Sequence, residues 1–421
     1  MTQTTTPGQP RLPVWSRITG SLNLPPGPRR TVAWSTLVNS VGTGMFVTAS
    51  ALYFTRVVGL SVAEVGLGLT VAGFVALSAN LTVGRLADGK GARGVWAASL
   101  AVEAAAMAAF LIVDSFWAFI VVACVSQFAA AASQTARLPV FRMVGGDSAT
   151  HLRSVIRTIV NLAASFGALV AGIAISLDVA PAYYTLIVAN ALTFAANVLI
   201  VLKLPKVEPT PRQARKKSDA ALRNLPFLAV TVLNAVLILQ APVFTFALPL
   251  WIATRTDAPA SLYALLVVLN TAVVTLFQIR ASRGVDGVSV AGRVMRTAGI
   301  GLAAAFLGIG ASSLFGPVGA VTVLIASVAL MSVAEIRYAA AEFELSFGLA
   351  PKALQGEYSG VFTLGLGLAT SAGPILLAVS VLSAGLAGWV ALALATCVAS
   401  LLVPWAVRLA ERQLQSIQPV A

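Results

Sequence analysis

The stretch GRLADGKGARG, residues 84–94, places glycines and basic residues between two long apolar runs. The string comes one residue short of a phosphate-binding loop, a motif that also needs a preceding strand and a Ser or Thr after its lysine. Here an apolar run of membrane-spanning length comes first, and Gly91 follows Lys90. The pattern therefore indicates a tight turn, in which Gly84 lets two helix ends approach and Gly89 and Gly91 can adopt positive φ angles.

Apolar runs recur on both sides of this turn. Of the 421 residues, 58% are hydrophobic and 10% are charged, whereas a soluble protein carries about 25% charged residues. Each run has about the 20 residues that cross a bilayer, and none alternates as a β-barrel strand does. The sequence predicts an all-α membrane protein with twelve transmembrane helices, at 31–55, 62–83, 94–113, 116–138, 155–177, 181–203, 225–252, 260–279, 292–312, 317–343, 355–380 and 384–408.

The basic residues lie almost entirely on one side of these spans. Of the 28 Lys and Arg, all but Arg56 and Arg255 fall on the side of the N-terminus. The positive-inside rule then predicts that both termini are cytoplasmic, in a multi-pass protein of the cell (inner or plasma) membrane. The same distribution explains the net charge of +13. Because the basic residues are spread between spans, a nucleic-acid partner is not expected.

A polar segment, 203–226, divides the spans into six and six. Thr55-Arg56 follows the first span and Thr254-Arg255 follows the seventh, and such weak symmetry between halves is typical of duplicated transporters. The predicted parts are a disordered cytoplasmic tail at 1–30, an N-terminal six-helix bundle at 31–203, a cytoplasmic linker at 204–224, a C-terminal six-helix bundle at 225–408 and a cytoplasmic tail at 409–421.

The opening string resembles the loop signature of the major facilitator superfamily, Gly-x-Leu-Ala-Asp-Arg-x-Gly-Arg-Lys. It departs from that signature at Gly89 and Ala92. The resemblance covers about 31–410 and implies two pseudo-symmetric six-helix bundles around a central cavity that opens to alternate sides. The matching positions are Gly84, Leu86, Ala87, Asp88, Gly91 and Arg93.

The resemblance also implies a clamp. In the family, the Asp and the following basic residue help to hold the two halves together on the cytoplasmic side. These roles fall on Asp88 and Arg93, with Asp147 as a further partner. The alternative is that Asp88 caps the next helix.

Two further glycine motifs lie inside spans. Gly167 and Gly172 in the fifth span belong to a run similar to the family's exporter signature, Gly-Pro-x-x-Gly-Gly, with Ala168 in place of the proline. Gly373-Pro374 takes the corresponding place in the eleventh span. Such residues permit close helix packing and bending, which is also their simplest explanation. In the seventh span, bends are expected at Pro242 and Pro249.

Two carboxylates lie well inside predicted spans, Glu103 in the third and Glu335 in the tenth. A charge at mid-bilayer costs about 2.5–3.5 kcal/mol, so such a residue faces a cavity, finds a partner or carries a proton. Arg337 points to another side of the helix than Glu335 and cannot pair with it. We interpret Glu335 as the preferred proton-coupling residue and Glu103 as the second. A structural bond from Glu335 to a neighbouring helix, or packing by Glu103, remains open.

Polar and aromatic residues recur at helical spacing in the spans that line the cavity in this family, the first, fourth, seventh and tenth. They are mostly neutral, which suits amphipathic or apolar solutes more than sugars or phosphates. Several of them will instead bond one helix to another. The predicted substrate-binding residues are Asn39, Thr43, Phe46, Tyr53, Gln127, Gln134, Asn234, Gln240, Phe244, Trp251 and Tyr338.

The function predicted from these features is secondary active transport, as proton-coupled efflux of small amphipathic or apolar compounds. The segment AEIRYAAAEFELSFGLAPKALQGEYSG, 334–360, is similar to that of bacterial drug:proton antiporters. The alternatives are a nutrient importer or facilitator of the same fold, or a non-transporting membrane sensor. The expected partners are the lipid bilayer, a small-molecule substrate and protons, with the chain as a monomer.

No cofactor is expected, because the proton gradient supplies the energy. The two cysteines and the single histidine, His151, do not make a metal site. No cluster of catalytic residue types occurs in the sequence, so an enzyme is not expected.

Overall fold

A computed structural model describes residues 27–145, 149–206, 220–281, 284–285, 287–351 and 354–417 of the chain. Within these residues the regular structure is helical, without a strand. Helices suit a membrane because they satisfy every backbone N–H and C=O within one segment. The prediction of an all-α membrane protein is therefore confirmed.

Six long helices make up the first half of the chain. On the side opposite the N-terminus, the first of them ends in a π-helical turn and the third in a 3₁₀ turn. The elements are α2 Pro28–Leu52 with the π-helical turn η1 Tyr53–Val57, α3 Val62–Lys90, α4 Ala92–Ala109 with the 3₁₀ turn η2 Phe110–Ile112, α5 Phe116–Gly145, α6 Ala149–Leu177 and α7 Ala180–Val201.

The second half begins with a short helix in the linker and then crosses six more times. Its elements are α8 Ala220–Arg223, α9 Leu225–Leu237, α10 Gln240–Pro242, the π-helical turn η4 Val243–Ala247, α11 Leu248–Arg255, α12 Leu262–Ala281, α13 Val288–Ala311, the 3₁₀ turn η5 Ser312–Leu314, α14 Pro317–Gly348, α15 Gln355–Leu377, the π-helical turn η7 Ala378–Leu382 and α16 Leu386–Ile417.

The described residues contain eleven helical segments long and apolar enough to cross a membrane. The segment from α9 to α11 counts as one of them, over Leu225–Arg255. The twelfth crossing is the shorter α12, whose apolar part is Leu262–Phe277. The predicted spans thus correspond to helices. The domain boundaries stay a prediction from the sequence.

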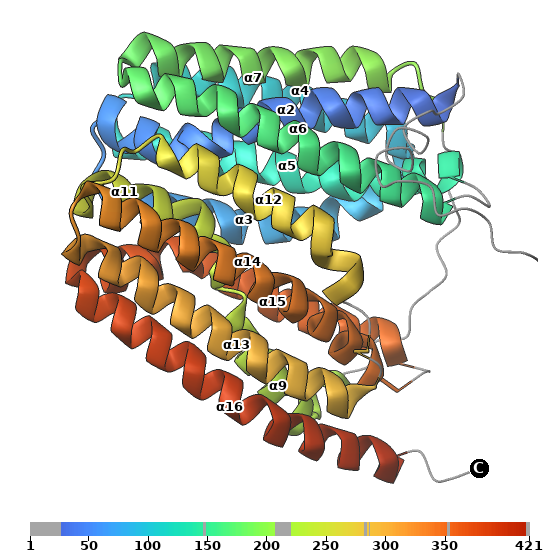
Figure 1. The fold of residues 1–421 in the computed structure, drawn as a ribbon. Coiled ribbons are helices and arrows are strands. Elements are labelled where there is room, and N and C mark those ends of the chain that lie inside the picture. The colour runs from blue at the N-terminus through green and yellow to red at the C-terminus, as the bar shows by residue number, and fades with distance from the viewer. Residues whose placement is uncertain are drawn as a thin grey trace, which may run out of the picture.

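The helices form two bundles that lie side by side (Figure 1). The N-bundle consists of α2–α7, blue to green, and the C-bundle of α9–α16, yellow to red. We call the side on which α2 begins and α16 ends the proximal side, at the right of Figure 1, and the opposite side the distal side. The bundles meet along two seams, one between α3 and α15 and the other between α6 and α12.

The structure corrects the predicted turn at 84–94. α3 continues as a helix to Lys90, so Gly84 and Gly89 are helical. Gly91 alone in this stretch has a positive φ, of 90°, and α4 begins directly after it. A glycine is tolerated inside a helix at a modest cost, and with no proline here the helix continues beyond the apolar run.

The seventh span is broken, as its two prolines led us to expect. The helical ladder of α9 ends at Leu237, and a π-helical turn follows Pro242. Pro249 starts the regular helix again as the second residue of α11. Gly373 of α15 lies so close to Pro242 that a Cβ at Gly373 would overlap the proline ring. The break in one helix thus lies against the glycine of its neighbour.

In the described part of the chain, small residues and two neutral hydrogen bonds join the bundles. On the α3–α15 seam, a Cβ at Gly66 would lie 2.9 Å from the carbonyl oxygen of Pro374. On the same seam the backbone N–H of Ile375 donates to Thr70 Oγ1 at 3.2 Å. Helices with small residues at the contact can approach this closely.

The α6–α12 seam has a similar construction. Gly172 lies against Ala264, and Asn161 Nδ2 donates to Thr275 Oγ1 at 3.3 Å. Both seams therefore combine a glycine contact with one neutral hydrogen bond.

Candidate functional site

A cavity of about 920 Å³ lies between the bundles and extends into the N-bundle. Every helix of the N-bundle contributes to its wall, whereas the C-bundle contributes from the broken seventh span, α12 and α15. α14 contributes none of the residues that line it. The cavity is therefore off centre, and its chemistry comes mainly from the first half of the chain.

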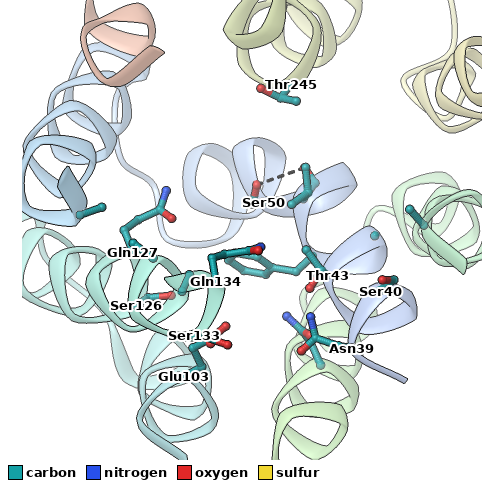
Figure 2. Close-up of a pocket in the computed structure, with 18 of the residues that line it drawn as sticks. Asn39, Ser40, Thr43, Ser50, Glu103, Ser126, Gln127, Ser133, Gln134 and Thr245 are labelled. Carbon is teal, nitrogen blue, oxygen red and sulfur yellow. Dashed lines mark hydrogen bonds between the residues drawn. The ribbon is translucent and has the colours of Figure 1, made fainter. Parts of the chain in front are cut away.

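The two walls differ in polarity. The N-bundle supplies hydroxyl and amide side chains from α2, α5 and α7, many of which converge in Figure 2. The C-bundle supplies Pro242, Phe244, Phe246 and Pro374, with few hydroxyls. One of these, Thr245, faces the polar wall from the opposite side in Figure 2, but its hydroxyl donates to the Ala241 carbonyl oxygen of its own helix. A solute in the cavity would thus meet hydrogen-bonding groups mostly on the N-bundle side.

Among the described residues that line the cavity, Glu103 and Arg137 are the charged ones. Glu103 on α4 is 6% exposed. Ser133 lies beside Glu103 (Figure 2), one turn before Arg137 on α5, and all three residues line the cavity. Glu103 Oε1 and Arg137 Nε are buried without a hydrogen-bond partner. The buried carboxylate thus leaves one oxygen without a hydrogen bond.

Both charged residues face the cavity. The sequence left open whether Glu103 serves only helix packing, and the structure places it at the cavity wall. Arg137 lines the cavity as well, and its Cζ lies 5.5 Å from the centre of the Phe141 ring. A guanidinium over an aromatic face is stabilised by the ring's charge distribution.

Aromatic rings close the distal end of the cavity. Phe46 stacks on Phe110, with centroids 5.6 Å apart, and Phe54 meets Phe110 edge to face at 5.1 Å. Across the cavity, Phe244 packs against Tyr263 at 5.9 Å. Such a cluster offers a flat apolar surface to an aromatic solute.

Asparagines on α7 add an amide network that our sequence analysis missed. Ser35 Oγ donates to Asn197 Oδ1 at 2.5 Å, and Asn197 Nδ2 donates to Asn39 Oδ1 at 3.2 Å. Asn190 lines the cavity seven residues before Asn197, on the same face of α7. Two amides with this spacing in an otherwise apolar span were the available signal, since polar residues are rare in such spans.

The predicted substrate-binding residues divide into two groups. Asn39, Thr43, Phe46, Gln127, Gln134 and Phe244 line the cavity. Tyr53, Asn234, Gln240, Trp251 and Tyr338 are buried elsewhere in the bundles and do not line it.

Tyr53 and Trp251 have structural partners instead. The Tyr53 hydroxyl donates to the carbonyl oxygen of Phe110 at 2.8 Å. The Trp251 indole N–H donates to the carbonyl oxygen of Ile309 at 2.9 Å. Each side chain satisfies a backbone group at the distal end of a neighbouring helix.

Glu335 has a partner from a neighbouring helix. Asn270 Nδ2 on α12 donates to Glu335 Oε2 at 2.8 Å and to Ser332 Oγ at 3.0 Å. Arg337, on another side of the helix, is exposed. The sequence left open that Glu335 makes a structural bond to a neighbouring helix, and this bond corresponds to that alternative. The helix that carries Glu335, α14, contributes no residue to the cavity wall.

The motif residues lie mainly at helix contacts. Arg93 Nη1 donates to the carbonyl oxygens of Leu202 and Leu204 at 3.2 and 2.7 Å, so it caps the end of α7 within its own bundle. Gly167 lies against the backbone of α2 at Val41. The other partners of the predicted clamp, the Asp88 side chain and Asp147, are outside the part of the chain that the structure describes.

No group of three or more His, Cys, Asp and Glu residues that could hold a metal occurs among the described residues.

Comparison with known families assigns the fold. The sequence model of the Major Facilitator Superfamily matches residues 32–374, which is most of the chain. The chain belongs to the major facilitator superfamily. Membership of this superfamily makes the protein a multi-pass membrane transporter, and the resemblance at 84–94 is confirmed at the level of the family. No curated protein sequence matches the chain.

Solved structures of the superfamily share the same arrangement. A mutant of the nucleoside transporter NupG superposes with a TM-score of 0.72 at 16% identity, covering 91% of this chain and 99% of the other. A peptide transporter POT in complex with sulfate gives 0.71 at 13% identity over 90% and 95% of the two chains. A bacterial homologue of the iron transporter ferroportin gives 0.69 at 15% identity over 91% and 98%. At these identities the likeness shows the fold alone.

Proposed function

We propose that this protein is a proton-coupled exporter of small amphipathic or apolar compounds that works by alternating access. The observation that carries the proposal is the cavity, which combines neutral polar and aromatic walls with a buried carboxylate, Glu103. Its volume of about 920 Å³ lies at the upper end of the range for drug-sized ligands. Neutral walls favour solutes that carry little charge.

Glu103 takes the proton-coupling role in this proposal, ahead of Glu335. An ionised carboxylate in the membrane is costly unless it is paired or protonated. Glu103 shares the cavity with the solute and leaves one oxygen without a partner, whereas Glu335 accepts a hydrogen bond from Asn270 at 2.8 Å, away from the cavity. A proton and a solute that bind in one cavity can each favour a different arrangement of the bundles, and this difference couples their movements.

The setting of the proposal follows the distribution of charge. We place both termini in the cytoplasm, because all of its 28 basic residues except Arg56, Arg255 and the cavity-lining Arg137 lie on that side of the spans. In this proposal the protein works as a monomer in the cell (inner or plasma) membrane. The proton gradient serves as its energy source, and the proposal needs no cofactor and no enzymatic step.

The second candidate is uptake or facilitated diffusion of a nutrient. It is supported by the neutral walls of the cavity, which would also admit an uncharged nutrient. The two candidates differ in direction and in their dependence on the proton gradient.

Everted membrane vesicles from cells that lack other pumps separate these functions. With an acidic vesicle lumen, an exporter accumulates neutral and cationic aromatic dyes, and nigericin abolishes the accumulation by collapsing the pH gradient. A facilitator equilibrates the dye with or without the gradient. Absence of movement for every compound in a chemically broad panel would favour a sensor and contradict both transport readings.

A further inference from the structure

The seam between α2 and α7 presents amide groups along the cavity wall. Asn190 and Asn197 occupy one face of α7, and Asn39 faces them from α2. In each cavity-facing amide, hydrogen bonds to neighbouring side chains decide which atom remains for a ligand.

The orientation of Asn39 is fixed by a chain of two bonds. Ser35 Oγ donates to Asn197 Oδ1, which directs the Asn197 amide nitrogen toward Asn39. Asn197 Nδ2 then donates to Asn39 Oδ1 at 3.2 Å. Because the carbonyl oxygen of Asn39 is occupied, its NH₂ group is the one left for the cavity.

The orientation of Asn190 is fixed by Thr193. The Thr193 hydroxyl shares its one proton between the Asn190 backbone carbonyl oxygen, at 2.7 Å, and Asn190 Oδ1, at 3.2 Å. Asn190 is 1% exposed, and its Nδ2 is buried without a hydrogen-bond partner. A buried donor without a partner is costly, so a ligand acceptor that reaches it gains affinity.

Gly42 allows α2 to approach Asn190. A Cβ at this position would overlap both Thr193 Oγ1 and Asn190 Oδ1. The seam is thus closed by a residue without a side chain, and the amide is held at the cavity wall.

An aromatic surface lies on the same face of α2 as Asn39. Phe46 follows Asn39 by seven residues, two helical turns, and stacks on Phe110 at the distal end of the cavity. A solute whose rings lie against Phe46 can therefore direct a polar atom toward the amide seam.

We propose that Asn190 and Asn39 form a donor subsite that recognises the carbonyl oxygen of neutral aromatic compounds. Both residues offer N–H groups, and each side-chain carbonyl oxygen already accepts one hydrogen bond, so the subsite favours acceptors over donors. This inference rests on the proposed function only in taking the cavity as the place where the transported solute binds.

The pair 9-fluorenone and fluorene tests the proposal, because the two molecules share a ring system and differ in one carbonyl oxygen. Their equilibrium binding is measured by dialysis with the purified full-length protein in detergent, without a pH gradient. We expect fluorenone to bind about tenfold more tightly, the difference that one buried hydrogen bond contributes. Equal affinities would overturn the subsite, and this comparison requires no mutation.

Variants then locate the preference. Asn190→Leu should remove the preference for fluorenone and leave fluorene binding unchanged, and Gly42→Ala should do the same by displacing the Asn190 side chain. Asn234→Leu is the matched control, since Asn234 on α9 is also a buried amide without a hydrogen-bond partner but lies outside the cavity wall, and it should retain the preference. Equal weakening of both ligands by Asn190→Leu would assign Asn190 a structural role and contradict the proposal.

The same measurements separate this inference from the proposed function. A fluorenone preference that depends on Asn190, in a protein that shows no gradient-driven transport, would support the subsite while rejecting proton-coupled export. Gradient-driven export without any preference between the two ligands would do the reverse.

Discussion

Tyr53 and Trp251 make equivalent contacts in the two bundles. The Tyr53 hydroxyl donates to the carbonyl oxygen of Phe110, where α4 passes into a 3₁₀ turn, and the Trp251 indole donates to that of Ile309, just before the 3₁₀ turn that follows α13. Each joins the distal end of the first helix of its bundle to the third. The symmetry between the halves is thus preserved in these bonds although the residue types differ.

Removing either bond should destabilise the fold. Tyr53→Phe leaves the Phe110 carbonyl oxygen with only the longer bond from the Val113 N–H, at 3.4 Å. We expect a loss of about 0.5–1.5 kcal/mol in the free energy of unfolding. Trp251→Phe should cost at least as much, because it also leaves a void. Thermal unfolding of the purified variants measures both effects.

Tyr184 provides the control for this comparison. It is 39% exposed and packs against the Tyr53 ring through its own ring. Tyr184→Phe should change stability by less than about 0.5 kcal/mol. A Tyr53→Phe protein as stable as the Tyr184→Phe protein would show that the bond to Phe110 contributes nothing.

Exchanging the two membrane carboxylates for amides should have unequal effects. Glu103→Gln is expected to abolish accumulation driven by a pH gradient while leaving gradient-free exchange of the solute, because the proton site is lost and the cavity keeps its shape. Glu335→Gln should transport close to normally, since a glutamine oxygen can still accept the Asn270 amide. The measurement is solute accumulation in proteoliposomes at several imposed gradients; the opposite ranking would return the proton to Glu335.

A methyl group in the α3–α15 seam should hinder closure of the bundles. Gly66→Ala would place a Cβ 2.9 Å from the Pro374 carbonyl oxygen, which is backbone and cannot move away easily. We therefore expect slower transport with substrate affinity little changed. The control is Gly360→Ala, on α15, the helix that Gly66 faces, because no atom lies within 4 Å of the added carbon there. Equal rates in both variants would mean that this approach is not needed for transport.

Reporter fusions test the orientation in the membrane. A fluorescent protein fused after residue 215, in the linker, should fold in the cytoplasm, and alkaline phosphatase fused after residue 255, at the end of α11, should be active outside. Both junctions in one compartment would contradict the proposed topology and, with it, the direction of efflux.

The helices could be predicted from the sequence because hydrocarbon imposes a length and a composition on each crossing. The position of Glu103 could not, because it depends on how far the cavity extends into one bundle. Periodicity places Glu335 on a face of its helix, but only the packed structure shows that this face meets Asn270 on α12. The length and apolar character of a segment predict that it crosses the membrane. Which of its side chains face the cavity depends on how the helices pack.

The amide network illustrates the same limit. Asn190 and Asn197 were visible as polar residues in an apolar span, yet the family resemblance directed attention to other helices. Their bonds to α2 depend on the close approach that Gly42 permits, a tertiary contact that no spacing rule predicts.

The polar bonds that join the two seams, Thr70 to Ile375 and Asn161 to Thr275, connect uncharged groups. Mobile ions screen charges and leave such bonds nearly unaffected. Along the described part of the interface, the contribution of these contacts to the balance between the two orientations should therefore be almost independent of ionic strength.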